Sequence, residues 1–400
     1  MNLRTVVALL GALSAGPFLS AQCSPAWAPV STPGVIAGVG GPVYAVAAVD
    51  FGSGPKAVVG GVFQTAGGIA AARAAFFDGV AWSPLGSGLD GAVRAFLFHD
   101  DGSGPALYAG GDFLNAGGQS AARIAKFDGV GWSPLGAGLN GVVRTLVAFD
   151  DGGGPQLYAG GSFTLAGGAP AGRIARFDGA TWTALGSGPG FDGDVLTLAV
   201  FDDGAGPKLY AGGAFSTVDG ASSPGVAVWN GVSWAAVGGG LSAATGGPPV
   251  EVASLLAGDA GDGPRLYAGG SFGAAAGVSV QNLAAFDGAV WSGLGVATTA
   301  VRALALHPIG GAPRLCAAAT FFDGSGSPTV GVLCRVGATP SSWTLTGTLG
   351  TPLTQDAKTL CSLPFGGAPA LVLGGDFSAI AGATGGATPT NHVAQWNGVR

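Results

Sequence analysis

Ionisable residues are scarce in this chain, and one dispersed group of them combines the side-chain types that a binding or catalytic site needs. Among 400 residues, Lys and Arg number 16, Asp and Glu number 22, and there are 3 histidines. The mixed group lies near the entries of apolar segments and comprises Asp90, Arg94, Arg144, Asp192, Asp194, Glu251, Arg302, Asp356 and Lys358. Carboxylate and cationic groups that share a mouth can bind a polar ligand or pair with one another, and we favour pairing.

Catalysis would require a denser arrangement of these groups. A carbohydrate hydrolase or lyase needs two convergent carboxylates or a histidine-based site in one pocket. Asp192, Asp194 and Glu251 form the densest acidic set, and the histidines are widely separated in the sequence. We therefore expect a binding module without catalytic residues, cofactor or metal, and keep a carbohydrate-active enzyme as the alternative.

A second set of carboxylates lies at the ends of apolar segments and in the glycine-rich turns that follow them. Its members are Asp50, Asp100, Asp101, Asp150, Asp151, Asp202, Asp203, Asp259 and Asp262. Calcium prefers oxygen ligands, but the chain contains no D-x-D-x-D-G loop. Asp and Gly are also the residues that tight turns favour. We expect these carboxylates to form turns, with calcium binding as the alternative.

The elements that position these residues recur along the chain. A GGxF phrase appears with its phenylalanine at Phe63, Phe113, Phe163, Phe215, Phe272, Phe321 and Phe377, although Ala318 and Ala319 replace the glycine pair in the sixth copy. An aromatic-acid-glycine phrase and then a tryptophan follow most copies. A period of about 50 residues lies in the range of propeller blades.

Each repeat reads as four short strands, as residues 93–134 show. Strand-like segments occur at 93–100, 106–113, 122–129 and 131–135, and glycine-rich turns bound them. The Asp of each FDG phrase is expected to fix its own turn. Arg73, Arg123 and Arg173 share one repeat position. We expect them to pair with Asp between repeats, with a ligand-facing ladder as the alternative.

The two ends of the chain carry complementary parts of one repeat. The last repeat stops at Trp396-Asn397-Gly398-Val399-Arg400, before its fourth strand, whereas residues 26–30 (AWAPV) match the fourth strand at 81–85 (AWSPL). We predict an all-β, seven-bladed β-propeller of four-stranded antiparallel blades, closed by this N-terminal strand in the C-terminal blade. The competing interpretation is a fragment of a longer protein.

The repeat resembles the kelch-type propeller. The matching positions in one repeat are Gly110-Gly111, Phe127-Asp128, Trp132 and Leu135, and the resemblance covers residues 25–400. The longer phrase GGxFxxAGG…IAxFDGxxWxxLG is also similar to repeats of bacterial secreted proteins and of fungal cortical-landmark surface proteins. This resemblance implies an extracellular or cell-surface binding role, with an unidentified protein or glycan as partner. It supplies no catalytic residue.

Residues 1–21 have the pattern of a signal peptide. Arg4 precedes the apolar run VVALLGALSAGPFL, and small residues precede Gln22. We expect a secreted or cell-surface monomer with one domain at 22–400. No later run of about 18 apolar residues predicts a membrane span. The net charge of −6 and the absence of a basic stripe argue against nucleic-acid binding.

An exported chain can form disulfides, and four cysteines lie beyond the signal segment. Cys316 and Cys334 fall on neighbouring antiparallel strands of the sixth repeat, so we predict a bridge between them. The pairing of Cys23 with Cys361 stays open.

Overall fold

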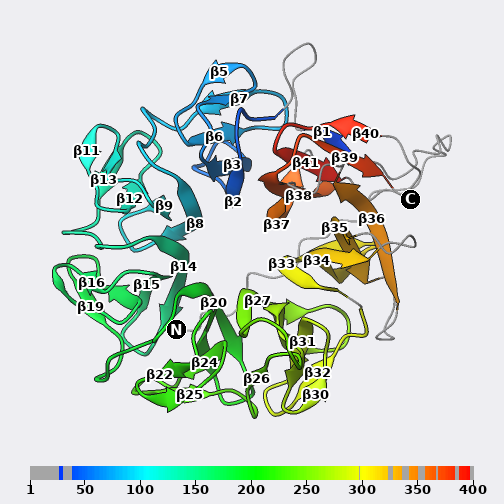
Figure 1. Ribbon diagram of the computed structural model, residues 1–400. Coiled ribbons are helices and arrows are strands. Elements are labelled where there is room, and N and C mark those ends of the chain that lie inside the picture. Colours follow the sequence, from blue (N-terminus) through cyan, green and yellow to red (C-terminus); the bar gives the residue numbers. More distant parts are fainter. Residues whose placement is uncertain are drawn as a thin grey trace, which may run out of the picture.

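The computed structural model describes residues 27–29, 38–296, 298–322, 328–335, 342–349, 356–365, 368–382 and 387–396. Within these residues the chain contains strands, bridges and turns, and no helix. The signal-peptide prediction falls on residues 1–21, which lie outside the described residues. The fold is all-β, and its four-stranded sheets follow one another around a central axis (Figure 1).

In six sheets, four strands follow the chain from the axis outward, and the last of these sheets has two further strands. The first three are β2 (Val43–Val49), β3 (Lys56–Gly61), β6 (Ala74–Phe77), β7 (Trp82–Pro84); β8 (Val93–Asp100), β9 (Pro105–Gly111), β12 (Ile124–Phe127), β13 (Trp132–Pro134); and β14 (Val143–Asp150), β15 (Pro155–Gly161), β18 (Ile174–Phe177), β19 (Trp182–Ala184). The next three are β20 (Val195–Asp202), β21 (Pro207–Gly213), β24 (Val226–Trp229), β25 (Trp234–Ala236); β27 (Glu251–Asp259), β28 (Pro264–Ser271), β31 (Leu283–Phe286), β32 (Trp291–Gly293); and β33 (Ala300–Ile309), β34 (Ala312–Phe322), β35 (Pro328–Arg335), β36 (Trp343–Leu349).

The remaining sheet combines both ends of the described chain. It has the order β37 (Asp356–Phe365), β38 (Ala368–Asp376), β41 (Val393–Trp396), β1 (Trp27–Pro29). β1 is antiparallel to β41, with Trp27 opposite Trp396 and Pro29 opposite Ala394. Residues 27–29 of the N-terminal segment therefore form the outer strand of this sheet.

Short hairpins and one extension complete the sheets. The hairpins are β4 (Thr65–Ala66) with β5 (Ile69–Ala70), β10 (Asn115–Ala116) with β11 (Gln119–Ser120), β16 (Leu165–Ala166) with β17 (Ala169–Pro170), β22 (Thr217–Val218) with β23 (Ala221–Ser222), and β29 (Ala274–Ala275) with β30 (Val278–Ser279), which β26 (Leu241–Ser242) joins. β36 pairs with β39 (Ala379–Gly382), which pairs with β40 (Ala387–Pro389).

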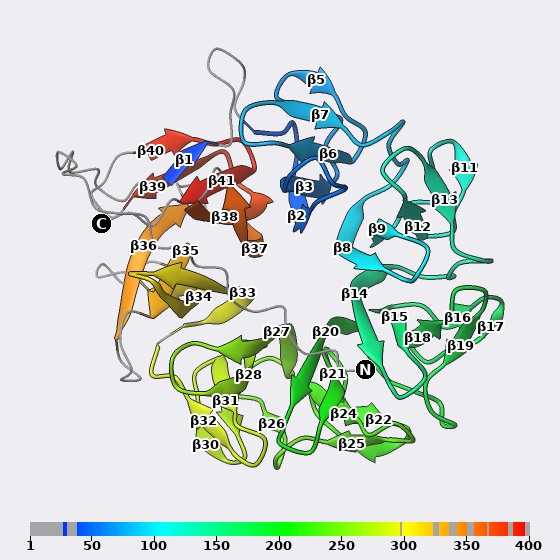
Figure 2. The ribbon, with the colours of Figure 1, turned by 180° about the vertical axis from the view of Figure 1, so that it is seen from behind.

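The innermost strand of each sheet lines the axis, as both face-on views show (Figures 1 and 2). These inner strands are β2, β8, β14, β20, β27, β33 and β37. Each contacts the inner strand of the next sheet, and β37 contacts β2. Their order around the axis is therefore the order of the chain.

The first glycine of each pair lies against the next sheet, and the second lies against the backbone at the start of its own inner strand. A Cβ on Gly110 would lie 2.4 Å from Cγ1 of Val143 on the next inner strand, and a Cβ on Gly111 would lie 2.0 Å from the carbonyl oxygen of Ala92. Glycine is therefore required at both positions by the close approach of neighbouring atoms. Where Ala318 replaces the first glycine, the next inner strand carries Ala357 in place of valine, and both alanines are buried in one cluster.

Tryptophans on four of the outer strands, β13, β19, β32 and β36, tie their sheet to the preceding one. The indole Nε1 of Trp132 donates to the carbonyl oxygen of Leu85 at 3.1 Å, and Trp182 donates in the same way to Leu135 at 3.0 Å. Trp132 and Trp182 are 5% exposed. The recurring tryptophan therefore combines burial with a hydrogen bond between sheets.

The FDG phrases form the turns that the sequence predicted. Oδ1 of Asp128 accepts hydrogen bonds from the backbone N–H groups of Val130 and Gly131, both at 2.9 Å. The same pattern occurs at Asp78, Asp178 and Asp287. These bonds lower the pKa of each of these carboxyl groups.

The prediction that Arg73, Arg123 and Arg173 pair with Asp between repeats is wrong. Each has a φ near +70°, and its side chain donates to backbone carbonyls instead. Arg123 donates to Leu139 at 3.0 Å, Arg173 to Phe191, and Arg73 to Val62 and Phe63. With the backbone left-handed at these positions, the guanidinium groups reach loop carbonyls.

Candidate binding site at one end of the central axis

A β-bulge at the start of every inner strand builds the candidate site. In β8 the register shifts between Val93 and Ala95, so Arg94 has no partner residue on β9. A bulge re-aims the side chain of its extra residue. The same shift occurs in all the other inner strands and isolates Tyr44, Arg144, Leu196, Ala253, Arg302 and Lys358.

These bulge residues converge on one hollow. All seven of them line a cavity of about 350 Å³, together with Asp356 and Ala357. This volume lies at the lower end of the range for small-molecule sites, about 300–1,000 Å³. The hollow is at the start of the inner strands, and the Asp-rich turns lie at their opposite ends.

The cations of the hollow have carboxylate partners close to them. Arg94 forms a bidentate pair with Asp112, with Nη2 2.7 Å from Oδ2. Nη2 of Arg144 lies 3.3 Å from Oδ2 of Asp194. The hydrogen bond to Asp112 raises the pKa of Arg94, so this guanidinium stays charged.

The opposite part of the hollow has two similar pairs. Nη1 of Arg302 lies 3.3 Å from Oε1 of Glu251, and Nζ of Lys358 lies 2.5 Å from Oδ2 of Asp356. The side chains of these four residues are between 29% and 39% exposed. Ion pairs exposed to this degree stabilise a protein by about 0–1 kcal/mol each. A ligand can therefore replace one partner at little cost.

Asp90 and Asp192 serve loops and do not line the hollow. Oδ1 of Asp90 accepts backbone hydrogen bonds from Leu114 and Asn115 at 2.8 and 2.9 Å. Oδ1 of Asp192 accepts the equivalent bonds from the backbone of Ser216 and Thr217. Burial opposes the shift, but these bonds outweigh it and keep the pKa of both carboxyls below the usual value.

The structure thus divides the residues that the sequence singled out. It brings Arg94, Arg144, Arg302 and Lys358 to one hollow, and places Asp194 and Glu251 beside them as ion-pair partners. Sequence reasoning missed the uncharged members, among them Tyr44. Its ring centroid lies 4.9 Å from the Arg94 guanidinium, a cation–π contact. The sequence feature that could have identified Tyr44 is its alignment with Arg94 at the same position of the repeat.

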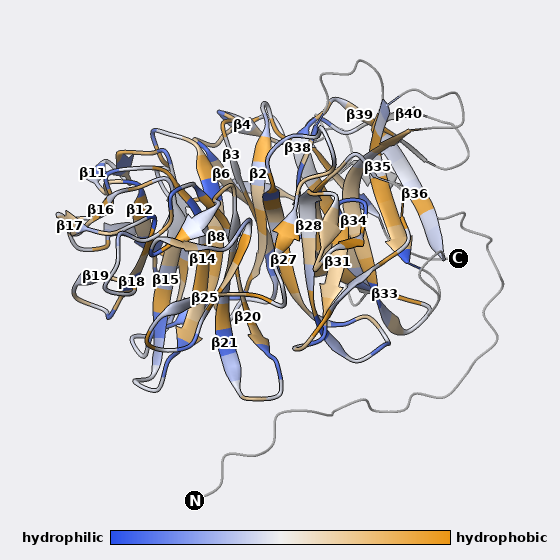
Figure 3. Cartoon of the chain, turned by 60° about the horizontal axis from the view of Figure 1, so that its bottom comes forward, coloured by the Kyte–Doolittle hydropathy of each residue, from blue (hydrophilic) through white to orange (hydrophobic). Residues whose placement is uncertain are grey.

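The carboxylates at the other end of the axis serve turns. Oδ1 of Asp100 accepts from the backbone N–H groups of Gly102 and Gly104 at 2.8 and 3.0 Å, and Asp202 repeats this pattern in the hydrophilic turn between β20 and β21 (Figure 3). Among the residues that the structure describes, no three His, Cys, Asp or Glu side chains are placed to hold a metal ion.

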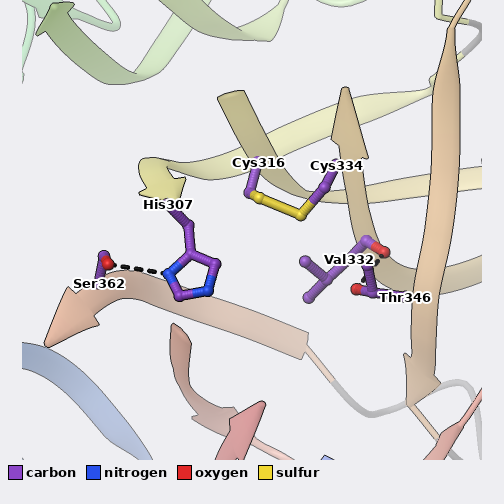
Figure 4. Close-up of a disulfide and its surroundings, with 6 residues drawn as sticks. All are labelled: His307, Cys316, Val332, Cys334, Thr346 and Ser362. Atoms are coloured by element: carbon purple, nitrogen blue, oxygen red, sulfur yellow. Dashed lines mark hydrogen bonds between the residues drawn. A yellow bond between two sulfur atoms is a disulfide. The ribbon is translucent and has the colours of Figure 1, made fainter. Parts of the chain in front are cut away.

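The predicted disulfide between Cys316 and Cys334 is confirmed (Figure 4). The two residues are opposite each other on β34 and β35. In the sheet of β9 and β12, the equivalent opposed residues are Tyr108 and Lys126. The bridge therefore occupies a cross-strand position that a tyrosine and a cation fill elsewhere.

A buried histidine lies at the boundary between the disulfide sheet and the next one. His307 on β33 is fully buried, and its Nδ1 lies 2.9 Å from Oγ of Ser362 on β37 (Figure 4). Burial lowers the pKa of His307 to about 4, so the ring is neutral at pH 7.

The remaining described cysteine is a half-buried thiol. Cys361 is free, and burial raises its pKa to about 11. A thiol with such a pKa is unreactive at neutral pH. The proposed partner of Cys361, Cys23, lies outside the described residues.

Comparison with solved structures supports the fold. The chain superimposes on the extracellular domain of a proposed hybrid two-component system, BT4673 of B. thetaiotaomicron, with a TM-score of 0.50 and 11% identity. The match covers 93% of this chain and 39% of that one. BBS1N, solved in complex with ARL6DN, matches with a TM-score of 0.52 and 11% identity over 94% of this chain and 97% of that chain. The fold is propeller-like.

Other comparisons add little. No protein-family model and no curated protein matches the chain. An ancestral GH74 enzyme matches with a TM-score of 0.32 and 12% identity over 90% of this chain and 65% of that chain, a similarity too low to carry an argument. In the part of the chain that the structure describes, no helix has the length and apolar character of a membrane span.

Proposed function

We propose that the protein is a secreted or cell-surface binding module whose ligand occupies the hollow of the bulge residues. The observation that carries this proposal is the convergence of one residue from every inner strand on a single cavity. Most of these residues are polar, although the strands that present them are largely apolar. Cations placed at a solvent-accessible concave surface are suited to binding a polar ligand.

The proposed scaffold is a kelch-like, seven-bladed propeller that β1 closes. Support comes from the four-stranded sheets around the axis, from the pairing of β1 with β41, and from the contact of β37 with β2. Closure matters for function because a rigid ring holds the bulge residues at fixed positions. A fixed arrangement reduces the entropy lost on binding.

Secretion is proposed from three independent features. Residues 1–21 have a signal-peptide pattern, the disulfide of Cys316 and Cys334 suits an oxidising compartment, and one structural neighbour is an extracellular domain. The partner would then be an extracellular protein or glycan, and the chain would act as a monomer of one domain at 22–400.

Binding is favoured over carbohydrate hydrolysis because the hollow lacks the groups for acid–base chemistry. Asp356 is the only carboxylate among the described residues that line it, and no histidine lines it. Hydrolysis of a glycosidic bond requires two carboxylates that flank the bond. The dense acidic set of the sequence does not supply them, because Asp194 and Glu251 pair with arginines and Asp192 serves a loop.

The test is a glycan and secreted-protein array probed with residues 22–400. We expect one class of ligand, and we expect its signal to fall in the double variant Arg302→Gln and Lys358→Gln. Arg265→Gln is the matched control, since Arg265 is also ion-paired and partly buried but lies away from the hollow. Array hits that both variants leave unchanged would place binding elsewhere and contradict the proposal.

A further inference from the structure

The charges around the hollow are not evenly distributed. In the order of the inner strands, Arg94 and Arg144 are adjacent to each other. The uncharged Leu196 and Ala253 follow them. Arg302 and Lys358 then form a second adjacent pair. Tyr44 then separates Lys358 from Arg94. The hollow therefore has two cationic pairs, which are separated by uncharged residues on both sides.

The cations face the hollow more than their partners do. Of the four carboxylates paired with these cations, only Asp356 belongs to the lining. The bidentate pair with Asp112 uses Nε and Nη2 of Arg94, and a guanidinium has five N–H donors. The ion pair of Arg144 with Asp194 is likewise made through Nη2. Donors thus remain for a group inside the hollow.

We propose that the hollow binds a molecule with two anionic groups separated by a neutral middle section. Arg94 and Arg144 hold one anionic group, and Arg302 and Lys358 hold the other. Leu196, Ala253 and the Tyr44 ring contact the middle section. This inference rests on the proposed function and specifies the chemistry of its ligand.

Two cationic pairs favour a dianion over a monoanion because both ends bind at once. When one end is bound, the other is held at a high effective concentration near its own pair. The advantage depends on length, since a molecule too short to span the hollow engages one pair only. A series of molecules of increasing length therefore tests the arrangement directly.

The experiment is calorimetric titration of residues 22–400, at low salt, with linear α,ω-dicarboxylates from succinate to sebacate. Monocarboxylates of equal chain length are the matched ligands. We expect at least one dicarboxylate to bind at least tenfold more tightly than its matched monocarboxylate, and we expect raised salt to weaken it. Equal affinities for the two series, or no binding by any dicarboxylate, would overturn the inference.

Variants locate the binding. Arg302→Gln combined with Glu251→Gln removes one cation and keeps the net charge constant, and its melting temperature checks the fold. We expect it to reduce the dicarboxylate affinity at least fivefold, and Arg265→Gln to leave it unchanged. Equal losses in both variants would overturn the inference.

The two proposals fail in different ways. If no dicarboxylate binds while array hits still depend on Arg302 and Lys358, the dianion inference is wrong and the proposed function stands. If the array hits do not depend on these residues either, both are wrong.

Discussion

The contact between Gly110 and Val143 predicts that larger side chains at the glycine position destabilise the fold unless the facing valine becomes smaller. The pair Ala318 and Ala357 shows this compensation at the sheet that lacks the glycine pair. A Cβ added at Gly110 would lie 2.4 Å from Cγ1 of Val143, and overpacking of this kind costs about 1–3 kcal/mol. Val143→Ala removes two buried methyl groups at about 0.8 kcal/mol each and leaves a cavity, so it costs about 2 kcal/mol. Together the two changes create the alanine pair that Ala318 and Ala357 form elsewhere.

We expect the double variant to cost about 2 kcal/mol instead of the sum of about 4 kcal/mol, because the new methyl group fills the cavity. Urea unfolding of residues 22–400 and of each variant measures these free energies. Gly131→Ala is the matched control, since its Cβ would meet no atom within 4 Å and its φ is not positive. Strictly additive losses, or an equal loss in Gly131→Ala, would refute the packing argument.

Three further predictions concern single sites. Burial lowers the pKa of His307 to about 4, so the unfolded chain takes up a proton at this residue before the folded chain does as the pH falls. The free energy of unfolding should therefore drop between about pH 6.5 and 4. Urea unfolding of His307→Phe should show much less of this pH dependence. Replacing Cys316 and Cys334 by alanine should lower the free energy of unfolding by about 3 kcal/mol, and a variant that melts like the parent would contradict the role of the bridge. At Asp101, burial opposes the shift, but hydrogen bonds from Ser103, Tyr108 and Lys126 lower the pKa. Asp101→Asn should therefore lower the free energy of unfolding by about 1–2 kcal/mol at pH 7. This difference should shrink as the pH falls below 3.8, and a difference that stays constant would contradict the role of these hydrogen bonds.

The repeat pattern was sufficient to predict the strands and their turns. Glycine pairs, FDG phrases and tryptophans each have a local physical role, so their spacing predicts the positions of the strands in each four-stranded sheet. The disulfide was also predictable, because Cys316 and Cys334 fall on strands that must be neighbours. The substitution of Ala318 for glycine was visible too, but its compensation by Ala357 was not, since that contact joins separate sheets.

The composition of the site was predictable only in part. The cations stood out as rare charges, but the bulges that point them at the axis depend on strand register, which their spacing does not reveal. Tyr44 and Leu196 carry no charge and so gave no signal apart from alignment. Arg123 was misassigned because its φ of 72° turns the side chain toward a carbonyl, and sequence patterns do not report this conformation.

Hydrogen exchange of β41 tests most directly whether the N-terminal strand completes the ring that holds the bulge residues. The measurement compares residues 22–400 with a chain that lacks residues 22–35, and follows the amides of Ala394, Gln395 and Trp396, which lie opposite β1. We expect deletion to speed the exchange of at least one of these amides, because it removes their hydrogen-bonding partner strand. Unchanged exchange throughout β41 would contradict closure by the N-terminal strand.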